Sequence, residues 1–376
     1  MATADPSFVE VLRKKTPAML DHLALLVNAE SGSSDLEGIA ACAGIIEEIG
    51  ADITGRAAER VETEGRVHLV WRFGSAVSSA GVLLVGHFDT VWPRGTLDRW
   101  PFTVEGERAS GPGAFDMKAG IVQMFHALEQ AGLPDGVTCV LTSDEELGSQ
   151  TSRSLVERLA TGASAALVLE PSVDGALKLA RKGTSMYEIA VEGRAAHAGL
   201  EPEKGANATV ELAHQIIAVT LLGRADLGTT VTPTVATGGT TTNTVPSHAA
   251  VQIDVRAESS TEQERVDAEL RGLRSTVDGT RLVVSGGPNR PPFPKDASAS
   301  LFRLARQAAA QVGLGPPRGE AVGGGSDGNF TAGIGVPTLD GLGAVGGKAH
   351  ADGEWVHVPS MAERAALLAQ LLILLR

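Results

Sequence analysis

The sequence predicts an α/β protein of two domains, in which one domain is interrupted by the other. Its 376 residues exceed the length of one typical domain, and 43% of them are hydrophobic, which suffices for a sizeable core. Strand-like runs alternate with helical patterns in the first half of the chain, as expected of a sheet covered by helices. This alternation changes near residue 181, which marks the start of the second domain.

The first domain begins with helical periodicity over residues 7–28 and 35–49, where apolar side chains recur three or four positions apart. Gly50 is the predicted end of the second helix. Short apolar runs bounded by turn residues predict buried strands, and a longer periodic run between them predicts a helix. The strands are expected at Val67–Phe73, Gly81–Val85, Val137–Leu141 and Ala165–Leu169, and the helix at Met117–Gln130.

The inserted domain has the order strand, helix, strand, strand, helix, strand, which is the split βαβ arrangement of a ferredoxin-like α+β module. Its elements are expected at Thr184–Val191, Ala206–Val219, Thr230–Ala236, Ala249–Ala257, Thr261–Ser275 and Arg281–Ser285. The segment GGPNRPPFP then predicts a return linker. We therefore assign residues 1–180 and 293–376 to the first domain and residues 181–292 to the insertion. Helices at 298–312 and 360–375 complete the first domain.

Composition excludes several classes of function. The net charge of −13 and the aromatic content of 4% disfavour binding to nucleic acid. No apolar run reaches the ~18 residues of a membrane span, and the first residues lack the apolar stretch of a signal peptide. We expect a cytoplasmic protein with a small-molecule substrate and no nucleic-acid or membrane partner. Cys42 and Cys139 are expected to fill core positions.

Potential metal ligands follow the predicted strands at their C-terminal ends, where α/β enzymes place their active sites. The strand VLLVG runs into His87 and Asp89, and a Gly-rich turn places Asp116 at the mouth of a helix. Further strands are followed by SDEELGS and LEPS, and a late Gly-rich loop carries GKAH. These segments supply Glu145, Glu146, Glu170 and His350.

Zinc suits this set, because it binds imidazole nitrogen at ~2.0 Å and carboxylate oxygen at ~2.0–2.2 Å. Two histidines and three acids, one of them shared, fit two metal ions ~3.5–4 Å apart. Asp89 lies two residues after His87 on the same face of an extended segment, so it can accept the other ring N–H of that histidine. Because Glu145 and Glu146 are adjacent, their side chains point apart. One can bind metal while the other acts as general base toward the bridging water.

Ordinary structural roles compete with these assignments. Asp116 is also suited to cap a helix, and the run Asp144–Glu146 to form a solvated acidic turn. His197 is compatible with an exposed loop, and Arg256 with a salt bridge. The sequence leaves these alternatives open.

The motifs HFDTV, GPGAFDMKAG, SDEELGS, LEPS and GKAH, in this order and spacing, resemble those of the dinuclear zinc aminoacylase and carboxypeptidase superfamily of metallopeptidases. Within it, the chain most resembles the bacterial glutamate carboxypeptidases that cleave folates. The resemblance covers nearly the whole chain. It implies a zinc-peptidase-like three-layer catalytic domain with an inserted ferredoxin-like domain that serves as lid and in dimerisation.

Carried over residue by residue, the resemblance implies two Zn²⁺ ions per subunit, which Co²⁺ or Mn²⁺ can replace. One is bound by His87, Asp116 and Glu170, and the other by Asp116, Glu146 and His350. Glu145 is then the catalytic base, and Asp89 orients His87. His197, Asn243 and Arg256 match residues of the inserted domain that bind substrate, the histidine acting across a homodimer. The family's pocket-lining loop corresponds to Gly323–Asn329, with Ser326 and Asp327.

The resemblance implies a zinc-dependent exopeptidase that hydrolyses the amide bond to a C-terminal amino acid, with glutamate as the expected residue. Glu145 assists the attack of a zinc-bridging water on an N-acyl-glutamate or a folate-like substrate. An N-acyl-amino-acid deacylase, a desuccinylase and a dipeptidase of the same superfamily are alternatives. A non-catalytic binding protein is an alternative of another class. The glutamate-releasing members of the superfamily vary in the segment around the last histidine ligand. In this chain that segment carries Lys348, two residues before His350.

Overall fold

The computed structural model describes residues 7–74 and 81–376, which form two compact units. The larger unit comprises the chain up to Ala180 together with Lys295–Val322 and Ser326–Arg376. The inserted unit comprises Arg181–Pro294 and Gly323–Gly325. Among the described residues, no helix has both the length and the apolar character needed to cross a membrane.

The larger unit is built on a six-stranded sheet with the order β1-β2-β6-β3-β7-β14. The strands are β1 (Glu59–Thr63), β2 (Arg66–Phe73), β3 (Val82–His87), β6 (Val137–Thr142), β7 (Ala165–Val168) and β14 (Thr338–Leu339). β6, β3, β7 and β14 are parallel to one another, whereas β2 is antiparallel to both β1 and β6. The carboxyl ends of the four parallel strands therefore meet at one edge of the sheet.

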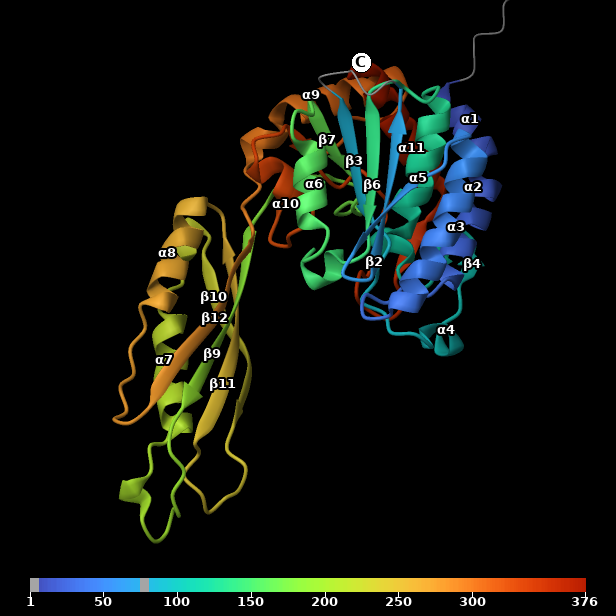
Figure 1. The fold of residues 1–376 in the computed structure, drawn as a ribbon. Coiled ribbons are helices and arrows are strands. Elements are labelled where there is room, and N and C mark those ends of the chain that lie inside the picture. Colours follow the sequence, from blue (N-terminus) through green and yellow to red (C-terminus); the bar gives the residue numbers. More distant parts are fainter. Residues whose placement is uncertain (1–6, 75–80) are drawn as a thin grey trace, which may run out of the picture. The chain divides into compact units, whose positions relative to one another are not determined.

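Helices cover both faces of this sheet, because successive side chains of its central strands point to opposite faces. In β3, Leu84 packs in one apolar cluster, whereas Leu83 and Val85 pack in another. The first cluster is closed by α1 (Phe8–Lys14), α2 (Thr16–Asn28), α3 (Leu36–Thr54), α5 (Ala119–Gln130), α9 (Lys295–Gln311) and α11 (Val358–Leu374). The second is closed by α6 (Arg153–Ala160) and α10 (Gly328–Gly333). Figure 1 shows α5 and α6 on opposite sides of the strands, which confirms the three-layer α/β prediction.

Two helices at the start of the larger unit differ clearly from the predictions. The single helix expected over 7–28 is two helices, because Pro17 has no N–H for the carbonyl of the preceding turn and lies in the first turn of α2. The helix expected to end at Gly50 continues to Thr54 and ends at Gly55, which has a left-handed φ of 65°. Instead, Gly50 allows α3 to pack closely against two aromatic rings. A Cβ there would lie 2.8 Å from the Trp71 ring and 2.9 Å from the Phe125 ring.

Short strands that the sequence did not predict form a second sheet in the larger unit. Its order is β15 (Gly346–Gly347), β16 (Trp355–His357), β5 (Arg108–Ser110) and β4 (Thr103–Glu105). The smaller pair β8 (Leu177–Arg181) and β13 (Gly319–Val322) and the short helix α4 (Thr96–Arg99) were also missed. The pairing of β16 with β5 matters for function, because it brings the late Gly-rich loop beside the turn that carries Asp116.

The inserted unit has the predicted βαββαβ order. Its elements are β9 (Gly183–Glu192), α7 (Ala208–Thr220), β10 (Thr230–Gly238), β11 (His248–Ala257), α8 (Ser260–Arg271) and β12 (Arg281–Arg290). The antiparallel sheet has the order β10-β11-β9-β12, and apolar side chains of the strands pack with those of the two helices. The predicted linker is partly wrong, because β12 continues through Gly286 and Gly287 to Arg290. As an edge strand, β12 tolerates Pro288, and its register shifts between Pro288 and Arg290.

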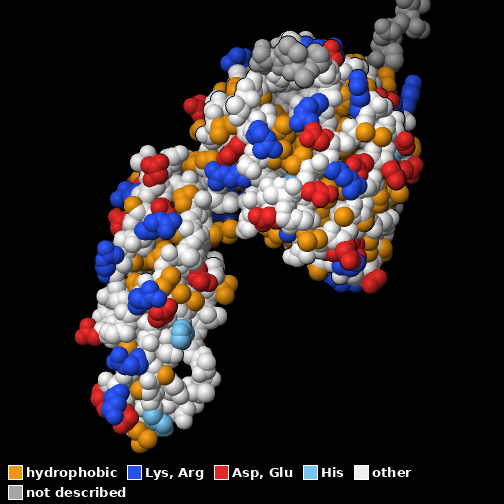
Figure 2. All heavy atoms as spheres, in the orientation of Figure 1, with side chains coloured by type: hydrophobic (Ala, Val, Ile, Leu, Met, Phe, Trp, Pro, Cys, Tyr) orange, Lys and Arg blue, Asp and Glu red, His pale blue; other side chains and the backbone are white. Residues whose placement is uncertain are grey.

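Charged side chains of both signs lie on the surface, whereas the two cysteines lie in the core. On the face shown in Figure 2, acidic and basic side chains are intermingled over both units. Cys42 and Cys139 are buried free thiols, as predicted.

Candidate metal centre

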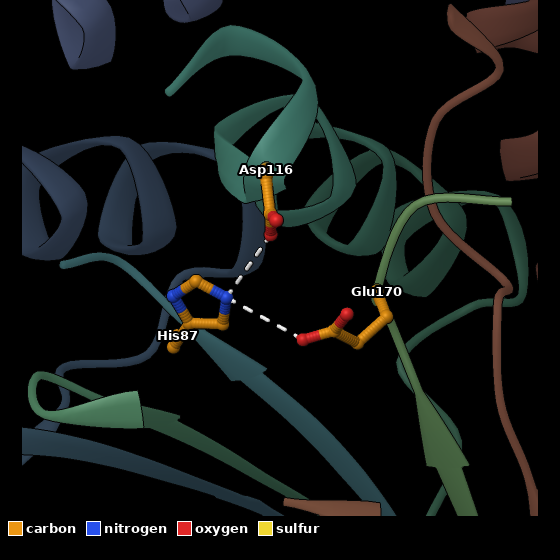
Figure 3. Close-up of side chains that lie close together, drawn as sticks. All are labelled: His87, Asp116 and Glu170. Carbon is orange, nitrogen blue, oxygen red and sulfur yellow. Dashed lines mark ion pairs between the residues drawn. The ribbon is translucent and has the colours of Figure 1, made fainter. Parts of the chain in front are cut away.

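Three side chains converge at the carboxyl edge of the central sheet. His87 ends β3, Glu170 lies two residues after β7, and Asp116 lies in the turn before α5. The Nε2 atom of His87 is 3.3 Å from Oδ1 of Asp116 and 3.5 Å from Oε1 of Glu170. Figure 3 shows both carboxylates directed toward the same imidazole nitrogen. This is the first group of ligands that the family resemblance implied.

A second group shares Asp116. The Nε2 atom of His350 lies 3.3 Å from Oδ2 of Asp116 and 3.1 Å from Oε1 of Glu146. Glu146 belongs to a short 3-10 turn, Glu145–Leu147, directly after β6, and His350 lies in the loop before β16. Each oxygen of Asp116 therefore faces a different histidine, so its carboxylate lies between the two groups.

The chemistry of these atoms fits metal ions. Among the described residues, His87 Nε2 and Asp116 Oδ1 are buried without a hydrogen-bond partner, although they face each other. Buried polar atoms without partners are rare in native proteins unless a ligand or ion satisfies them. Imidazole nitrogens and carboxylate oxygens are also the donors that zinc accepts. The residues present therefore fit a centre of two metal ions bridged by Asp116.

Without cations, the carboxylates hold protons on both histidines. Hydrogen bonds with Asp116 and Glu146 raise the pKa of His350 to about 10. Burial lowers the pKa of His87, but the acidic side chains of Asp116, Asp89 and Glu170 around it outweigh this effect and raise the pKa well above its usual value. A metal ion bound at either nitrogen would take the place of that proton.

Asp89 connects the first group to the turn that follows β6. Its carboxylate is fully buried, with Oδ1 3.4 Å from Nδ1 of His87. The backbone carbonyl of Asp89 lies closer to that nitrogen, at 3.0 Å. The same carboxylate accepts the backbone N–H groups of Glu145 and Glu146, each at 3.2 Å. The side chain of Glu145 is itself buried and is one of the acids that raise the pKa of His87.

The three predicted substrate-binding residues of the inserted unit lie on different segments: two on adjoining loops and the third on β11. His197 and Asn243 are exposed and lie on adjoining segments, since the N–H of Ala198 donates to the carbonyl of Asn243 at 2.9 Å. Arg256 forms a bidentate ion pair with Asp254 at 2.6 and 2.7 Å, as the salt-bridge alternative anticipated.

The loop Gly323–Asn329 contributes buried polar groups. The Ser326 hydroxyl donates to Asp340, and Asp327 accepts from Thr142 at 2.9 Å and from Ser149. Both side chains are therefore held inside the protein by hydrogen bonds rather than exposed in a pocket.

Sequence reasoning missed one buried acid beside the centre. Glu354 has a relative exposure of 0%, and its carboxylate accepts N–H groups from the turn that contains Asp116. The only signal in the sequence is that this acid lies four residues after His350.

Comparisons with known proteins agree with this geometry. Residues 83–374 match the model of the peptidase family M20/M25/M40. Carboxypeptidase G2 of Pseudomonas sp. strain RS-16 is 31% identical over 381 residues, covering 95% of this chain and 89% of that protein. Succinyl-diaminopimelate desuccinylase 2 of Shewanella loihica is 30% identical over 279 residues, covering 67% of this chain and 74% of that protein.

A solved structure shares the fold. It is described as an M20 family metallo-carboxypeptidase, Sso-CP2, from Sulfolobus solfataricus. The TM-score is 0.77 at 18% identity, and the match covers 95% of this chain and 99% of that one. From the family match and the relatives together, the chain belongs to the M20/M25/M40 peptidase family and is a metallo-carboxypeptidase or related amide hydrolase.

Proposed function

We propose that this enzyme is a zinc-dependent exopeptidase that hydrolyses the amide bond to a C-terminal glutamate. The observation that carries the proposal is the pair of ligand groups that share Asp116, with the buried acid Glu145 beside them. The choice of glutamate is supported by the similarity to carboxypeptidase G2 along 95% of the chain.

The proposed metal ligands are His87, Asp116 and Glu170 for one zinc ion and Asp116, Glu146 and His350 for the other. When bound in such a site, zinc lowers the pKa of a water toward ~7 and polarises the scissile carbonyl. Glu145 takes the proton of the attacking water and later gives it to the leaving amine nitrogen. Asp89 keeps Glu145 in place by accepting its backbone N–H, and it also keeps His87 oriented.

A cavity within the larger unit supports an apolar acyl group on the substrate. Its volume is about 420 Å³, and Glu146 of the second ligand group lies in its wall. Trp92, Val91 and Leu147 supply apolar surface to this cavity. Its cation, Arg94, is already paired with Asp35. An aromatic acyl group, as in a folate, therefore suits the cavity better than an anionic succinyl group does.

The inserted unit is proposed to bind the other end of the substrate. His197 and Asn243 are exposed polar groups suited to the oxyanion and the terminal carboxylate. To bind that carboxylate, Arg256 must first release Asp254, its ion-pair partner in the structure. We further propose that this unit acts as a lid and mediates a homodimer.

The test is a panel of N-acyl amino acids. Release of amino acid is measured from N-acyl-glutamate, aspartate and alanine, from a folate and from N-succinyl-diaminopimelate. We expect kcat/KM to be highest for the glutamate substrates that carry aromatic acyl groups. A preference for the succinyl substrate would favour the desuccinylase alternative, which the similarity to the Shewanella loihica protein supports.

The same panel tests the mechanism. Glu145→Gln removes the base but keeps the size of the side chain, and we expect kcat to fall by ~10²–10⁴-fold with unchanged metal content. Glu59→Gln is the control, because the Glu59 side chain is 54% exposed on the edge strand β1 and pairs with Arg72 rather than with a residue of the cavity. Equal activity of the wild type and the Glu145→Gln variant on every substrate would rule out the proposed hydrolase mechanism.

A further inference from the structure

The carboxylate of Glu354 binds the main chain of the turn that carries Asp116. Its Oε1 atom accepts the N–H groups of Phe115 and Asp116 at 2.8 and 2.9 Å. Its Oε2 atom accepts the N–H of Gly113 at 3.1 Å and the indole N–H of Trp92 at 2.9 Å. One carboxylate thus holds three amides of a single turn, including the amide of the shared metal ligand itself.

This arrangement is unusual for a fully buried acid. Within residues 7–74 and 81–376, no lysine or arginine forms an ion pair with Glu354, so its hydrogen bonds come from uncharged donors. Burial of a carboxylate is unfavourable unless hydrogen bonds replace its water. An apolar side chain would avoid that penalty but would leave the amides of Gly113, Phe115 and Asp116 without an acceptor.

The main chain of Glu354 makes a second connection to the same region. Its carbonyl accepts the N–H of Gly111 at 3.3 Å and the hydroxyl of Ser110 at 2.8 Å, next to the pairing of β16 with β5. His350 lies only four residues earlier, in a loop where its own φ is 60°. A shift of Glu354 relative to the turn would therefore alter the distance between Asp116 and His350.

We propose that Glu354 is a positioning residue that fixes the Asp116 turn against the His350 loop, and so sets the geometry of the group formed by Asp116, Glu146 and His350. The inference rests on the proposed metal centre. It assigns no contact between Glu354 and substrate or metal. In the group of His87, Asp116 and Glu170, Glu354 positions one ligand, Asp116. In the other group it positions two, Asp116 and His350, so the first group is expected to be affected less.

The decisive variant is Glu354→Gln. Glutamine has the same size, but its NH₂ group cannot accept from the main-chain amides, so at least one of them loses its acceptor. Asp352→Asn is the matched control, because Asp352 is in the same loop, carries the same charge and pairs with Arg99 at the surface. Trp92→Phe removes the indole donor, together with part of the ring that packs against Trp100, and leaves the Glu354 carboxylate in place.

The readout is Co²⁺ titration of the metal-free protein, followed by visible absorption. We expect two binding steps in the wild type. In Glu354→Gln, one step should weaken by about 10–100-fold, and its absorption bands should change, because mutation of groups that orient metal ligands has effects of this size. Asp352→Asn should match the wild type, and Trp92→Phe should lie between that control and Glu354→Gln.

The outcomes separate this inference from the proposed function. If the wild type binds no Co²⁺, the metal centre itself is wrong. If the wild type binds two ions and Glu354→Gln has the same affinities and bands, only the positioning role is wrong. If the glutamine variant does not fold, Glu354→Asp, which keeps the charge on a shorter side chain, is titrated instead. Loss of the fold in both variants would show that Glu354 is a determinant of folding and would overturn the proposal.

Discussion

The position of Asp116 between two imidazoles determines how the centre responds to substitution. Each of its carboxylate oxygens lies 3.3 Å from the Nε2 atom of a different histidine. His350, in contrast, contacts only the second group. Substitution of Asp116, which belongs to both groups, should therefore reduce the metal content more than substitution of His350, which belongs to one.

We expect Asp116→Asn to reduce the zinc content from about two ions per chain to well below one, because an amide offers a single oxygen and cannot bridge. His350→Ala should lose about one ion and keep the other. Elemental analysis of protein purified with excess zinc measures both values. Two zinc ions retained in Asp116→Asn would contradict the shared-ligand geometry.

Three residues of this centre could be predicted because each follows a predicted strand: His87, Glu146 and Glu170. Asp116 and His350 lie in Gly-rich segments, and their assignment relied on the resemblance to the zinc peptidases. His87 and Glu170 are placed by the ends of β3 and β7, so their convergence follows from a parallel sheet. Glu354 could not be predicted in this way. Its partners are main-chain amides about 240 positions earlier, as the separations of 238, 239 and 241 residues show. No pattern of side chains encodes such contacts.

At the scale of elements, packing overrides local signals. Gly50 was predicted to end a helix, but it lies within α3, where the rings of Trp71 and Phe125 leave no room for a side chain. The strands β5 and β16, of three residues each, are too short to show a period in the sequence. Long buried strands and helices were predicted well because their apolar periodicity extends over more residues.

The packing of α3 gives a direct comparison of two glycines. Gly50→Ala should destabilise the protein by ~1–3 kcal/mol, because its Cβ would overlap the two rings. Gly44→Ala, in the same helix, should stabilise it by ~0.5–1 kcal/mol, since a Cβ there has only the Arg60 guanidinium within 4 Å. Urea denaturation of both variants measures the difference. Similar stabilities would mean that ring packing does not explain Gly50.

The contact between α2 and α5 should be sensitive to acid. Nδ1 of His22 lies 3.3 Å from Nε2 of His126, and the rings are stacked. Burial, and then the proximity of His22, lower the pKa of His126 from 6.5 to about 4. The folded state therefore favours the neutral ring, and the unfolded state binds the proton first. This stabilisation is complete above pH 6.5 and is lost as the pH falls toward 4.

We expect this contact to account for ~2–3 kcal/mol of the stability lost between pH 7 and pH 4. His126→Leu should reduce the loss, because leucine has no proton to bind. His214→Asn is the control, since His214 is exposed on α7. The midpoint of urea denaturation, measured at several pH values, gives the dependence. An equal pH dependence in wild type and His126→Leu would exclude this pair as its source.

For the whole molecule, the distribution of exposed apolar side chains points to the inserted unit. Ile217 of α7 is 65% exposed, Leu221 is 78% exposed and Val235 of the edge strand β10 is 60% exposed. The net charge of −13 opposes association, so contact between two chains requires apolar surface of this kind. We therefore place the proposed homodimer interface on α7 and β10.

We expect the wild type to sediment as a dimer and the double variant Ile217→Asp, Leu221→Asp to sediment as a monomer, because two buried carboxylates facing each other across an interface are strongly unfavourable. Leu25→Asp is the matched control, since Leu25 is a 51% exposed leucine on α2 of the larger unit. Analytical ultracentrifugation at several concentrations measures the state of each protein. If His197 acts across the dimer, the monomeric variant should also lose activity while it keeps both metal ions. A monomeric wild type, or a dimer that survives both aspartates, would move the interface away from this surface.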